Sequence, residues 1–332
     1  MDTATQPPGT SELESPPCPL CGGDDFRDVI AAVCDRVMRK PGRFSVQSCR
    51  HCGLVVTRPR PTAKALDFYY QGTYSGTANH QARALQTGGP GRIAARYRLR
   101  AVQRWRSLGP GQQLLDVGCG YGTFASEARR GTGCTATGID VDAGCLLNAL
   151  DRGEVTYHCG TLETLALPPE QFDVISFFES LEHHADPVAA LRAAHVLLKP
   201  GGLCVVEVPN FAGIWRRVFG SWWLPLLVPQ HLVHFDPATL RRTLETAGFT
   251  VDALHRAMFY PVESPASLGL WLNDRLGRLI RGYRLRWRRP DGALLLAILA
   301  LWWALVELPS QAVLVLLGRS GHQLMVGAKP DS

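Results

Sequence analysis

The sequence predicts an α/β fold built around a mostly parallel sheet, and three observations support this prediction. Residues 114–117 form a short apolar run that ends in a turn with glycines at positions 118, 120 and 122. A second apolar run, residues 134–139, ends at Asp140, and a third occupies residues 171–177. Short apolar runs separated by segments long enough for a helix are typical of buried parallel strands joined by crossover helices.

The turn after the first predicted strand is suited to a nucleotide-like ligand. Gly118, Gly120 and Gly122 lack Cβ atoms where the backbone must turn sharply and approach a ligand. Asp140 follows about twenty residues later, where a carboxylate can accept both ribose hydroxyls. The G-x-G-x-G pattern lacks the wider last gap of the dinucleotide fingerprint and the lysine of a P-loop. It therefore favours S-adenosylmethionine over NAD or ATP, and a tight loop without a ligand is the alternative.

With these landmarks the chain resembles the class I S-adenosylmethionine-dependent methyltransferases, from about residue 97 to residue 209. The matching stretches, in the order of that family, are residues 160–165, 171–177, 182–187 and 197–202. The resemblance implies a Rossmann-like, seven-stranded, mostly parallel sheet and a methyltransferase activity. The chain departs from the family at Thr161, where many relatives carry an Asp that bonds the adenine amino group.

The resemblance also implies which residues surround the cofactor. These residues follow the predicted strand ends and are Asp116, Gly118, Cys119, Gly120, Gly122, Asp140, Val141, Leu162, Glu163 and Phe178. Asp140 is expected to hold the ribose, and Glu163 or backbone groups are expected to replace the missing adenine contact. Asp116 is expected either to touch the ligand or to organise the glycine turn.

Two C-x-x-C-G sequences near the N-terminus predict a metal site. Cys18 and Cys21 form the first pair, and Cys49 and Cys52 form the second. Each pair can bend two thiolates onto one ion, and two pairs complete a tetrahedral site. Because four thiolates leave no position for water, the expected zinc is structural. The alternative is four unrelated thiols, and Cys34 is expected to be a bystander.

The chain of 332 residues is expected to contain one large α/β domain with smaller additions. The predicted parts are a disordered lead (1–15), a zinc-ribbon-like module with a hairpin at 24–47 (16–60), a helical lead-in or lid (61–110), the cofactor-binding core (111–259), a basic and hydrophobic helical insert (260–320), and the last strand and tail (321–332). The lead-in is expected to contain helices at 62–70 and 93–108 and a polar linker at 71–91. Tyr69, Tyr70 and Tyr74 are candidates to line the lid, or they pack the junction.

Two groups of residues are candidates to bind and deprotonate a methyl acceptor. Glu179, Glu182 and His183 follow the fourth predicted strand, where ligands bind in open α/β sheets. Their E-x-x-E-H spacing resembles the divalent-ion site of polyprenyl-phenol O-methyltransferases, which implies magnesium, and helix capping is the alternative. His231 and His234 lie in a stretch that resembles zinc-ribbon-bearing methyltransferases of sugar and cell-surface glycan pathways. They are expected to face the acceptor or to pack in the core.

The final third of the chain raises the question of a membrane partner. Residues 293–317 are strongly apolar but contain Glu307 and Pro309, so the segment is predicted to be too interrupted to cross a bilayer. Residues 275–289 contain seven arginines. A basic region beside an apolar one is typical of proteins that lie on an anionic bilayer. Residues 275–317 are therefore expected either to contact a membrane peripherally or to pack as an extra helical layer.

The leading functional hypothesis is a cytoplasmic methyltransferase, located at the inner face of the cell membrane if residues 275–317 bind lipid. Its expected acceptor is a small molecule or a lipid-linked glycan, methylated on a sugar or aromatic hydroxyl or on the carbon of a nucleotide sugar. An RNA methyltransferase is a weaker alternative, because the net charge of +6 is modest and no base-amine motif follows the fourth strand. A non-catalytic membrane adaptor is the third hypothesis.

Overall fold

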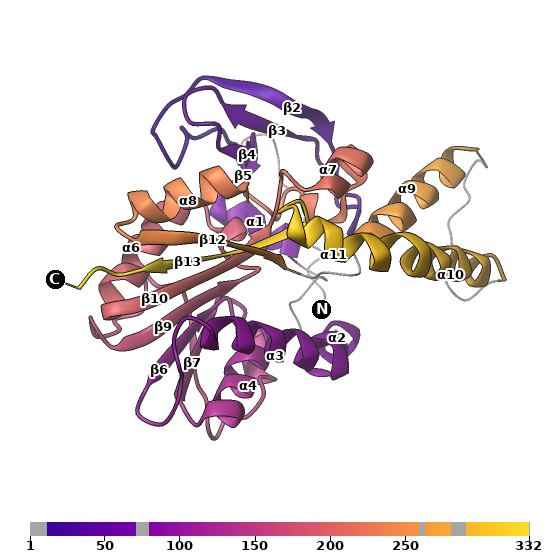
Figure 1. The fold of residues 1–332 in the computed structure, drawn as a ribbon. Helices are drawn as coiled ribbons and strands as arrows, with labels where there is room; N and C mark the ends of the chain where they lie inside the picture. The colour runs from indigo at the N-terminus through magenta and orange to yellow at the C-terminus, as the bar shows by residue number, and fades with distance from the viewer. Residues whose placement is uncertain (1–11, 71–79, 259–262, 280–289, 332) are drawn as a thin grey trace, which may run out of the picture.

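The structure, a computed structural model, describes residues 12–70, 80–258, 263–279 and 290–331. The strands of its main sheet are β6 (Gln113–Val117), β7 (Thr135–Asp140), β8 (Thr156–Cys159), β9 (Phe172–Phe178), β10 (Leu198–Pro209), β12 (Thr250–Met258) and β13 (His322–Ala328). They are ordered β12-β13-β10-β9-β6-β7-β8 (Figure 1). The strands from β10 to β8 run parallel, and β13 is antiparallel to both neighbours. The predicted mostly parallel, seven-stranded sheet is confirmed.

Helices cover both faces of this sheet. On one face lie α3 (Gly89–Gln103) and α4 (Thr123–Thr132), and on the other lie α6 (Pro187–Leu197) and α8 (Pro237–Thr246) (Figure 1). The short α5 (Ala143–Leu147) packs beside β7 and β8. With both faces covered, all seven residues of β9 are buried, which explains why apolar side chains occupy both faces of the strand.

Two helices that flank the functional region begin with the same local chemistry. The Asp186 side chain accepts a hydrogen bond from Ala189 N at the start of α6, and Asp236 accepts one from Thr239 N at the start of α8. A proline follows each aspartate at the first helical position, where its missing N–H has no intrahelical partner to lose. These caps fix where each helix begins.

The N-terminal module contains β2 (Phe26–Val33), β3 (Phe44–Cys49) and β4 (Val55–Thr57). The antiparallel pairing of β2 with β3 confirms the predicted hairpin. The four-stranded sheet is completed by β11 (Val233–His234), which comes from the cofactor-binding core and pairs with β4. The module and the core are therefore joined through a shared sheet.

Two expectations about the N-terminal region are wrong. Part of the lead expected to be disordered is ordered, because β1 (Leu13–Glu14) pairs with β5 (Arg60–Pro61), while residues 1–11 lie outside the described residues. After α1 (Ala63–Tyr70), the expected polar linker is helical from its tenth residue on, in α2 (His80–Thr87) and the start of α3. The polar α2 is too short to be stable by itself, and its packing against α3 stabilises it.

The C-terminal insert is a pair of helices that extends away from the sheet (Figure 1). It consists of α9 (Glu263–Leu279) and a continuous helix made of α10 (Pro290–Trp302), a π-helical turn (Trp303–Glu307) and α11 (Leu308–Leu316), and α9 packs on α7 (Ile214–Phe219). The expected interruption at Glu307 and Pro309 is wrong. Glu307 is fully buried, and Pro309 comes two residues after the end of the π-helical turn, so the helix continues through both residues. By length and composition, residues 296–316 could cross a membrane.

Candidate functional site

The glycine turn after β6 lies against the end of β7. All three glycines of the predicted pattern have positive φ angles, between 53° and 74°. Gly118 N and Cys119 N both donate hydrogen bonds to Ile139 O, at 2.8 and 3.0 Å. A Cβ atom at Gly118 would lie 2.4 Å from Ser180 Oγ. The backbone can therefore approach the strand ends only because this residue has no side chain.

Asp140 is held at the end of β7, next to the glycine turn. Gly120 N donates to its Oδ2 at 2.8 Å, and Asp142 N donates to its Oδ1 at 2.9 Å. Burial raises the pKa of Asp140, and the two amide hydrogen bonds oppose this rise. The neighbouring Val141 is 71% exposed. A fixed carboxylate beside an open apolar side chain and a glycine backbone fits the ribose and base of an adenosyl group.

The other predicted cofactor residues fall into two groups. Glu163 is exposed on the same edge as Val141. The Phe178 ring instead packs edge-on against Phe124, with ring centroids 4.6 Å apart, and Leu162 is 5% exposed in the core. The side chains of Phe178 and Leu162 therefore face the protein interior. Burying these large apolar groups stabilises the fold more than leaving them exposed at the edge of the sheet would.

Asp116 lies near the end of β6, two residues before the glycine turn. Its side chain is 3% exposed and accepts a hydrogen bond of 2.8 Å from Ser176 Oγ. Burial raises its pKa to about 7. Of the two roles expected for Asp116, this position fits the organisation of the turn.

Helix α2 lies beside the glycine turn, since Thr123 Oγ1 at the start of α4 donates to Gln86 O at 3.1 Å. The tyrosines expected to line a lid have different surroundings. Tyr69 is buried and packs edge-on against Phe44, so it belongs to the junction, and Tyr74 lies outside the described residues. Tyr70 reaches the functional region described next.

Glu182, His183 and His231 converge just beyond the glycine turn. Each offers one ligand atom, and these atoms lie within 4.8 Å of one another. Glu182 and His183 belong to a one-turn helix (Leu181–His183) after β9, while His231 lies in the loop before β11. Ser180, which abuts Gly118, immediately precedes this turn, so the cluster borders the predicted cofactor site.

Backbone carbonyls orient the two imidazoles of this cluster. His231 Nδ1 lies 2.8 Å from Pro225 O, and His183 Nδ1 lies 3.1 Å from Gln230 O and 2.7 Å from Tyr70 Oη. Burial lowers the pKa of His183 to about 4 and that of His231 well below its usual value, so both rings are neutral. Neutral imidazoles with one nitrogen bonded to the backbone are suited to ligate a metal through the other.

The Glu182 carboxylate has no hydrogen-bond donor among the described residues, although its side chain is 1% exposed. The neutral His231 ring lies close to it, with Nε2 3.9 Å from Oε1. Burial raises the pKa of Glu182 well above its usual value, and Glu179 adds to this effect. A buried carboxylate without donors beside two neutral imidazoles fits a divalent cation.

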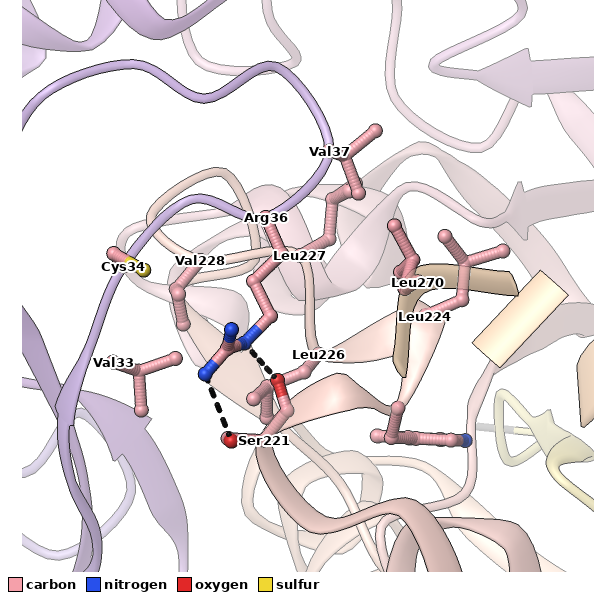
Figure 2. A pocket seen from close by; sticks show the side chains of 11 residues that line it. Val33, Cys34, Arg36, Val37, Ser221, Leu224, Leu226, Leu227, Val228 and Leu270 are labelled. Atoms are coloured by element: carbon pink, nitrogen blue, oxygen red, sulfur yellow. Dashed lines mark hydrogen bonds between the residues drawn. The ribbon is translucent and has the colours of Figure 1, made fainter. Parts of the chain in front are cut away.

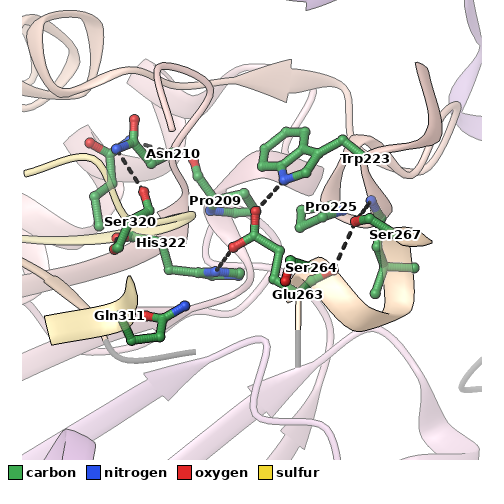
Figure 3. Close-up of polar contacts among 12 residues, drawn as sticks. Pro209, Asn210, Trp223, Pro225, Glu263, Ser264, Ser267, Gln311, Ser320 and His322 are labelled. Carbon is green, nitrogen blue, oxygen red and sulfur yellow. Dashed lines mark hydrogen bonds and ion pairs between the residues drawn. The ribbon is translucent and has the colours of Figure 1, made fainter. Parts of the chain in front are cut away.

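Glu179 does not join this cluster, contrary to the expected magnesium ligand set. Its Oε2 lies 3.3 Å from His322 Nε2 at the start of β13, and His322 Nδ1 lies 3.7 Å from Glu263 Oε2 on α9. Glu263 also accepts a hydrogen bond from Trp223 Nε1 (Figure 3). His231 completes the candidate ligand set in place of Glu179, for which the resemblance implies that role. No local motif in the sequence marks His322 or Glu263, so neither could be identified before the fold was known.

His234 does not face the site either. Its Nε2 lies 3.0 Å from Thr57 Oγ1 on β4, and its ring is 5% exposed beside Phe211. Burial lowers the pKa of His234 to about 3, so it is a neutral packing residue. The Thr57 hydroxyl donates to His231 O at 2.7 Å. The N-terminal module therefore holds the loop that carries His231.

The four predicted metal cysteines come together in the N-terminal module, with all sulfurs within 4.8 Å of one another. The Sγ atoms of Cys18 and Cys52 are 3.4 Å apart, and those of Cys21 and Cys49 are 3.6 Å apart. A tetrahedral zinc site with bonds of about 2.3 Å has sulfurs roughly 3.7 Å apart. The backbone N–H groups of Gly22 and Gly53 each donate to the carbonyl oxygen of the first cysteine of their pair, which forms the tight turns that a zinc knuckle needs.

A small pocket lies at the junction of the module with residues 220–228 (Figure 2). Arg36 crosses this junction and donates through Nε to Ser221 O at 2.8 Å. Cys34 lines the pocket and does not belong to the four-cysteine group, so the expectation that it is a bystander fits the structure. The remaining lining is mostly apolar and offers no cluster of catalytic groups.

Comparisons with known proteins match this part of the chain. A family profile described as a methyltransferase domain matches residues 85–254. The chain is 35% identical over 172 residues to a ubiquinone biosynthesis O-methyltransferase of Aeromonas salmonicida, an alignment that covers 48% of this chain and 71% of that protein. It is 34% identical to the corresponding enzyme of Idiomarina loihiensis, over 46% of this chain and 68% of that protein.

A solved structure shares the fold. Phosphoethanolamine N-methyltransferase 2 of Haemonchus contortus, in complex with S-adenosyl-L-methionine, matches with a TM-score of 0.50. The match covers 92% of this chain and 68% of that chain at 17% sequence identity. At this level of identity the similarity shows the architecture alone.

Proposed function

This chain belongs to the class I S-adenosylmethionine-dependent methyltransferases, and we propose that it methylates a hydroxyl oxygen of a small-molecule or lipid-linked acceptor. The observation that carries the proposal is the buried cluster of Glu182, His183 and His231 beside the glycine turn. Two relatives that are named O-methyltransferases support an oxygen acceptor. We infer an acceptor site between this cluster and Glu179.

Transfer to a hydroxyl forms an O–C bond, breaks the S–C bond of the sulfonium and releases the hydroxyl proton. We assign the acceptance of this proton to Glu179, whose side chain is 29% exposed. Burial alone would raise the pKa of Glu179, but the adjacent His322 lowers it below its usual range, so the carboxylate is ionised at neutral pH. Tyr70 and the backbone carbonyls of residues 225 and 230 keep the two imidazoles in place.

A divalent cation held by Glu182, His183 and His231 would polarise the acceptor oxygen and make its proton easier to remove. Two imidazoles with one carboxylate suit manganese, iron or zinc better than the magnesium implied by the sequence. Titration of manganese into the zinc-loaded protein should reveal one site, and Glu182→Gln should remove it. Equal manganese binding by both proteins would contradict this ligand set.

The first acceptor class to test is a phenolic hydroxyl, because both named relatives act in ubiquinone biosynthesis. A sugar hydroxyl on a lipid-linked glycan is the second, since the sequence resembles methyltransferases of glycan pathways. Mass spectrometry of reactions with labelled S-adenosylmethionine should detect a methyl ether. Methylation of amines or carbon atoms alone would contradict an oxygen acceptor.

Cofactor binding is tested separately from the acceptor. Calorimetric titration with S-adenosylmethionine should show one site, and Asp140→Ala should abolish it because the carboxylate that fits the ribose is removed. Arg130→Ala is a suitable control, since this arginine is bound to Asp151 on the exposed side of α4. Unchanged binding by Asp140→Ala would show that the adenosyl group lies elsewhere.

We propose that Cys18, Cys21, Cys49 and Cys52 hold one structural zinc ion. A site closed by four thiolates has no open position for a substrate, so its contribution is to fold the module and, through β4 and β11, to position His231. Elemental analysis should find about one zinc per chain. Cys52→Ser should lose this zinc, and a metal-free wild-type protein with an intact fold would overturn the assignment.

A further inference from the structure

The helix formed by residues 296–316 exposes most of its apolar side chains, and we propose that it lies in the surface of an anionic lipid bilayer. Only 11% of its most apolar window is buried against the protein. Large apolar side chains along the helix are between 39% and 85% exposed; they are Leu296, Ile298, Leu301, Trp303, Leu305, Val313 and Leu316. Contiguous exposed apolar surface of this kind marks an interaction site in proteins.

The distribution of these side chains around the helix favours a bilayer over a single protein partner. At about 100° per residue, the exposed positions span roughly 200° of the helix circumference. A helix that packs on one neighbour needs an apolar stripe of roughly 100°. A second copy of this chain, seated against one side, would leave much of the apolar surface in water. A lipid surface can cover all of it.

The polar groups of this helix point toward the protein. Glu307 is the one ionisable residue in the sequence of 296–316, and its side chain is fully buried. It accepts hydrogen bonds from Ser264 Oγ on α9 and from Gln311 Nε2, the latter at 2.6 Å. Trp302 Nε1 donates to the same serine at 2.9 Å. The outward side therefore carries no charge that would oppose its entry into lipid.

Basic residues lie next to the helix in the sequence. Residues 275–289 precede α10 in the sequence and contain seven arginines and no acidic residue. Arg319 follows the other end of the helix. Positive charge on both sides of an apolar helix complements the phosphates of anionic lipids. The C-terminal end of the helix leads into β13 of the main sheet, so a helix that crossed the bilayer would leave residues 275–289 on the opposite side. Seven arginines would then have to pass through the hydrocarbon, and the helix therefore lies in the interface instead.

The base of the insert adjoins the proposed acceptor site. Glu263, the first residue of α9, pairs with His322 (Figure 3). His322 in turn pairs with Glu179. A bilayer bound by the insert would therefore place a lipid-borne acceptor at the edge of the sheet where Glu179 lies. This last step rests on the proposed function, whereas membrane binding itself does not.

Sedimentation with vesicles tests the proposal on the full-length, zinc-loaded protein. Vesicles of mixed phosphatidylglycerol and phosphatidylcholine should sediment the wild-type protein, and vesicles of phosphatidylcholine alone should do so less well. The double variant Leu301→Asp/Leu305→Asp changes side chains that are 60% and 67% exposed. It should weaken vesicle binding more than roughly tenfold, because two apolar anchors become charged.

A matched control changes equally exposed apolar residues on the catalytic domain. Leu147 and Val196 are 62% and 56% exposed, and Leu147→Asp/Val196→Asp should bind vesicles like the wild type. Unchanged S-adenosylmethionine binding in both double variants would show that the fold and the proposed enzyme are intact. Absence of wild-type binding to anionic vesicles would overturn the proposal. So would a wild-type dimer that the Leu301/Leu305 variant dissociates while vesicle binding is unaffected, since a second copy would then cover the helix.

Discussion

Thr57→Val is the sharpest test of the idea that the N-terminal module holds the functional site together. The Thr57 hydroxyl is buried, donates to His231 O at 2.7 Å and accepts from His234 Nε2 at 3.0 Å. Valine has nearly the same shape but no hydroxyl. The substitution therefore removes both hydrogen bonds without creating a cavity and leaves a buried carbonyl and a buried ring N–H without this partner.

A buried polar group left without its partner costs about 1–3 kcal/mol. For a domain of 150–250 residues, each kcal/mol lowers Tm by about 2–4 °C, and we expect Thr57→Val to lower it by about 2–12 °C. Because the same hydrogen bond fixes the loop that carries His231, manganese affinity should also fall. Calorimetric scanning measures the first effect, and metal titration measures the second.

Thr250→Val is the matched control. Thr250 Oγ1 donates to Ala328 O at 3.1 Å, but this hydroxyl is exposed, so water can replace it. The control should change stability by less than about 0.5 kcal/mol and leave metal affinity unaltered. A Thr57→Val protein with the melting temperature and manganese affinity of the wild type would refute the proposed coupling between the module and the site.

Three further predictions concern stability. Gly321→Ala should destabilise the protein by about 3–5 kcal/mol in urea unfolding, because the added Cβ would lie 1.3 Å from Glu263 Oε2 and would break the buried ion pair of Glu263 with His322. Gly153→Ala should be nearly neutral, because the space around its Cβ is open. Equal urea midpoints for the two variants would contradict this prediction. Burial alone would raise the pKa of Asp173, but its bonds to a lysine, an arginine and a backbone N–H outweigh burial and hold the pKa below its usual value. The contribution of Asp173 to stability is therefore present above about pH 4, and it is lost as the pH falls through the lower folded-state pKa. Asp173→Asn should therefore flatten the loss of stability between neutral and acidic pH, and an unchanged acid profile would argue against it. Asp236→Ala should cost about 1 kcal/mol, measured by thermal unfolding, through loss of the N-cap of α8.

Much of the cofactor site could be predicted because its signals are local. The glycines between 118 and 122 and the acid at Asp140 occupy consecutive strand ends, and the order of parallel strands brings those ends to one edge. The paired cysteines were equally clear, since the C-x-x-C spacing fixes two sulfurs on one turn. In both cases residues close in sequence carry the chemistry, so the pattern contains the geometry.

The remaining features depend on how distant segments return to one another. The sequence left open whether Glu179 binds a metal and whether His234 faces the acceptor or packs in the core. The tertiary structure decides both, because it pairs Glu179 with His322, 143 residues away, and directs His234 toward Thr57. The unbroken helix at 296–316 likewise depends on the burial of Glu307 against α9. No local pattern contains these outcomes, because the direction of a buried polar side chain is decided by whichever partner the packed chain brings within hydrogen-bonding distance. The sequence by itself thus determined the cofactor class and the main sheet, and only the tertiary structure decided which acids and histidines work together.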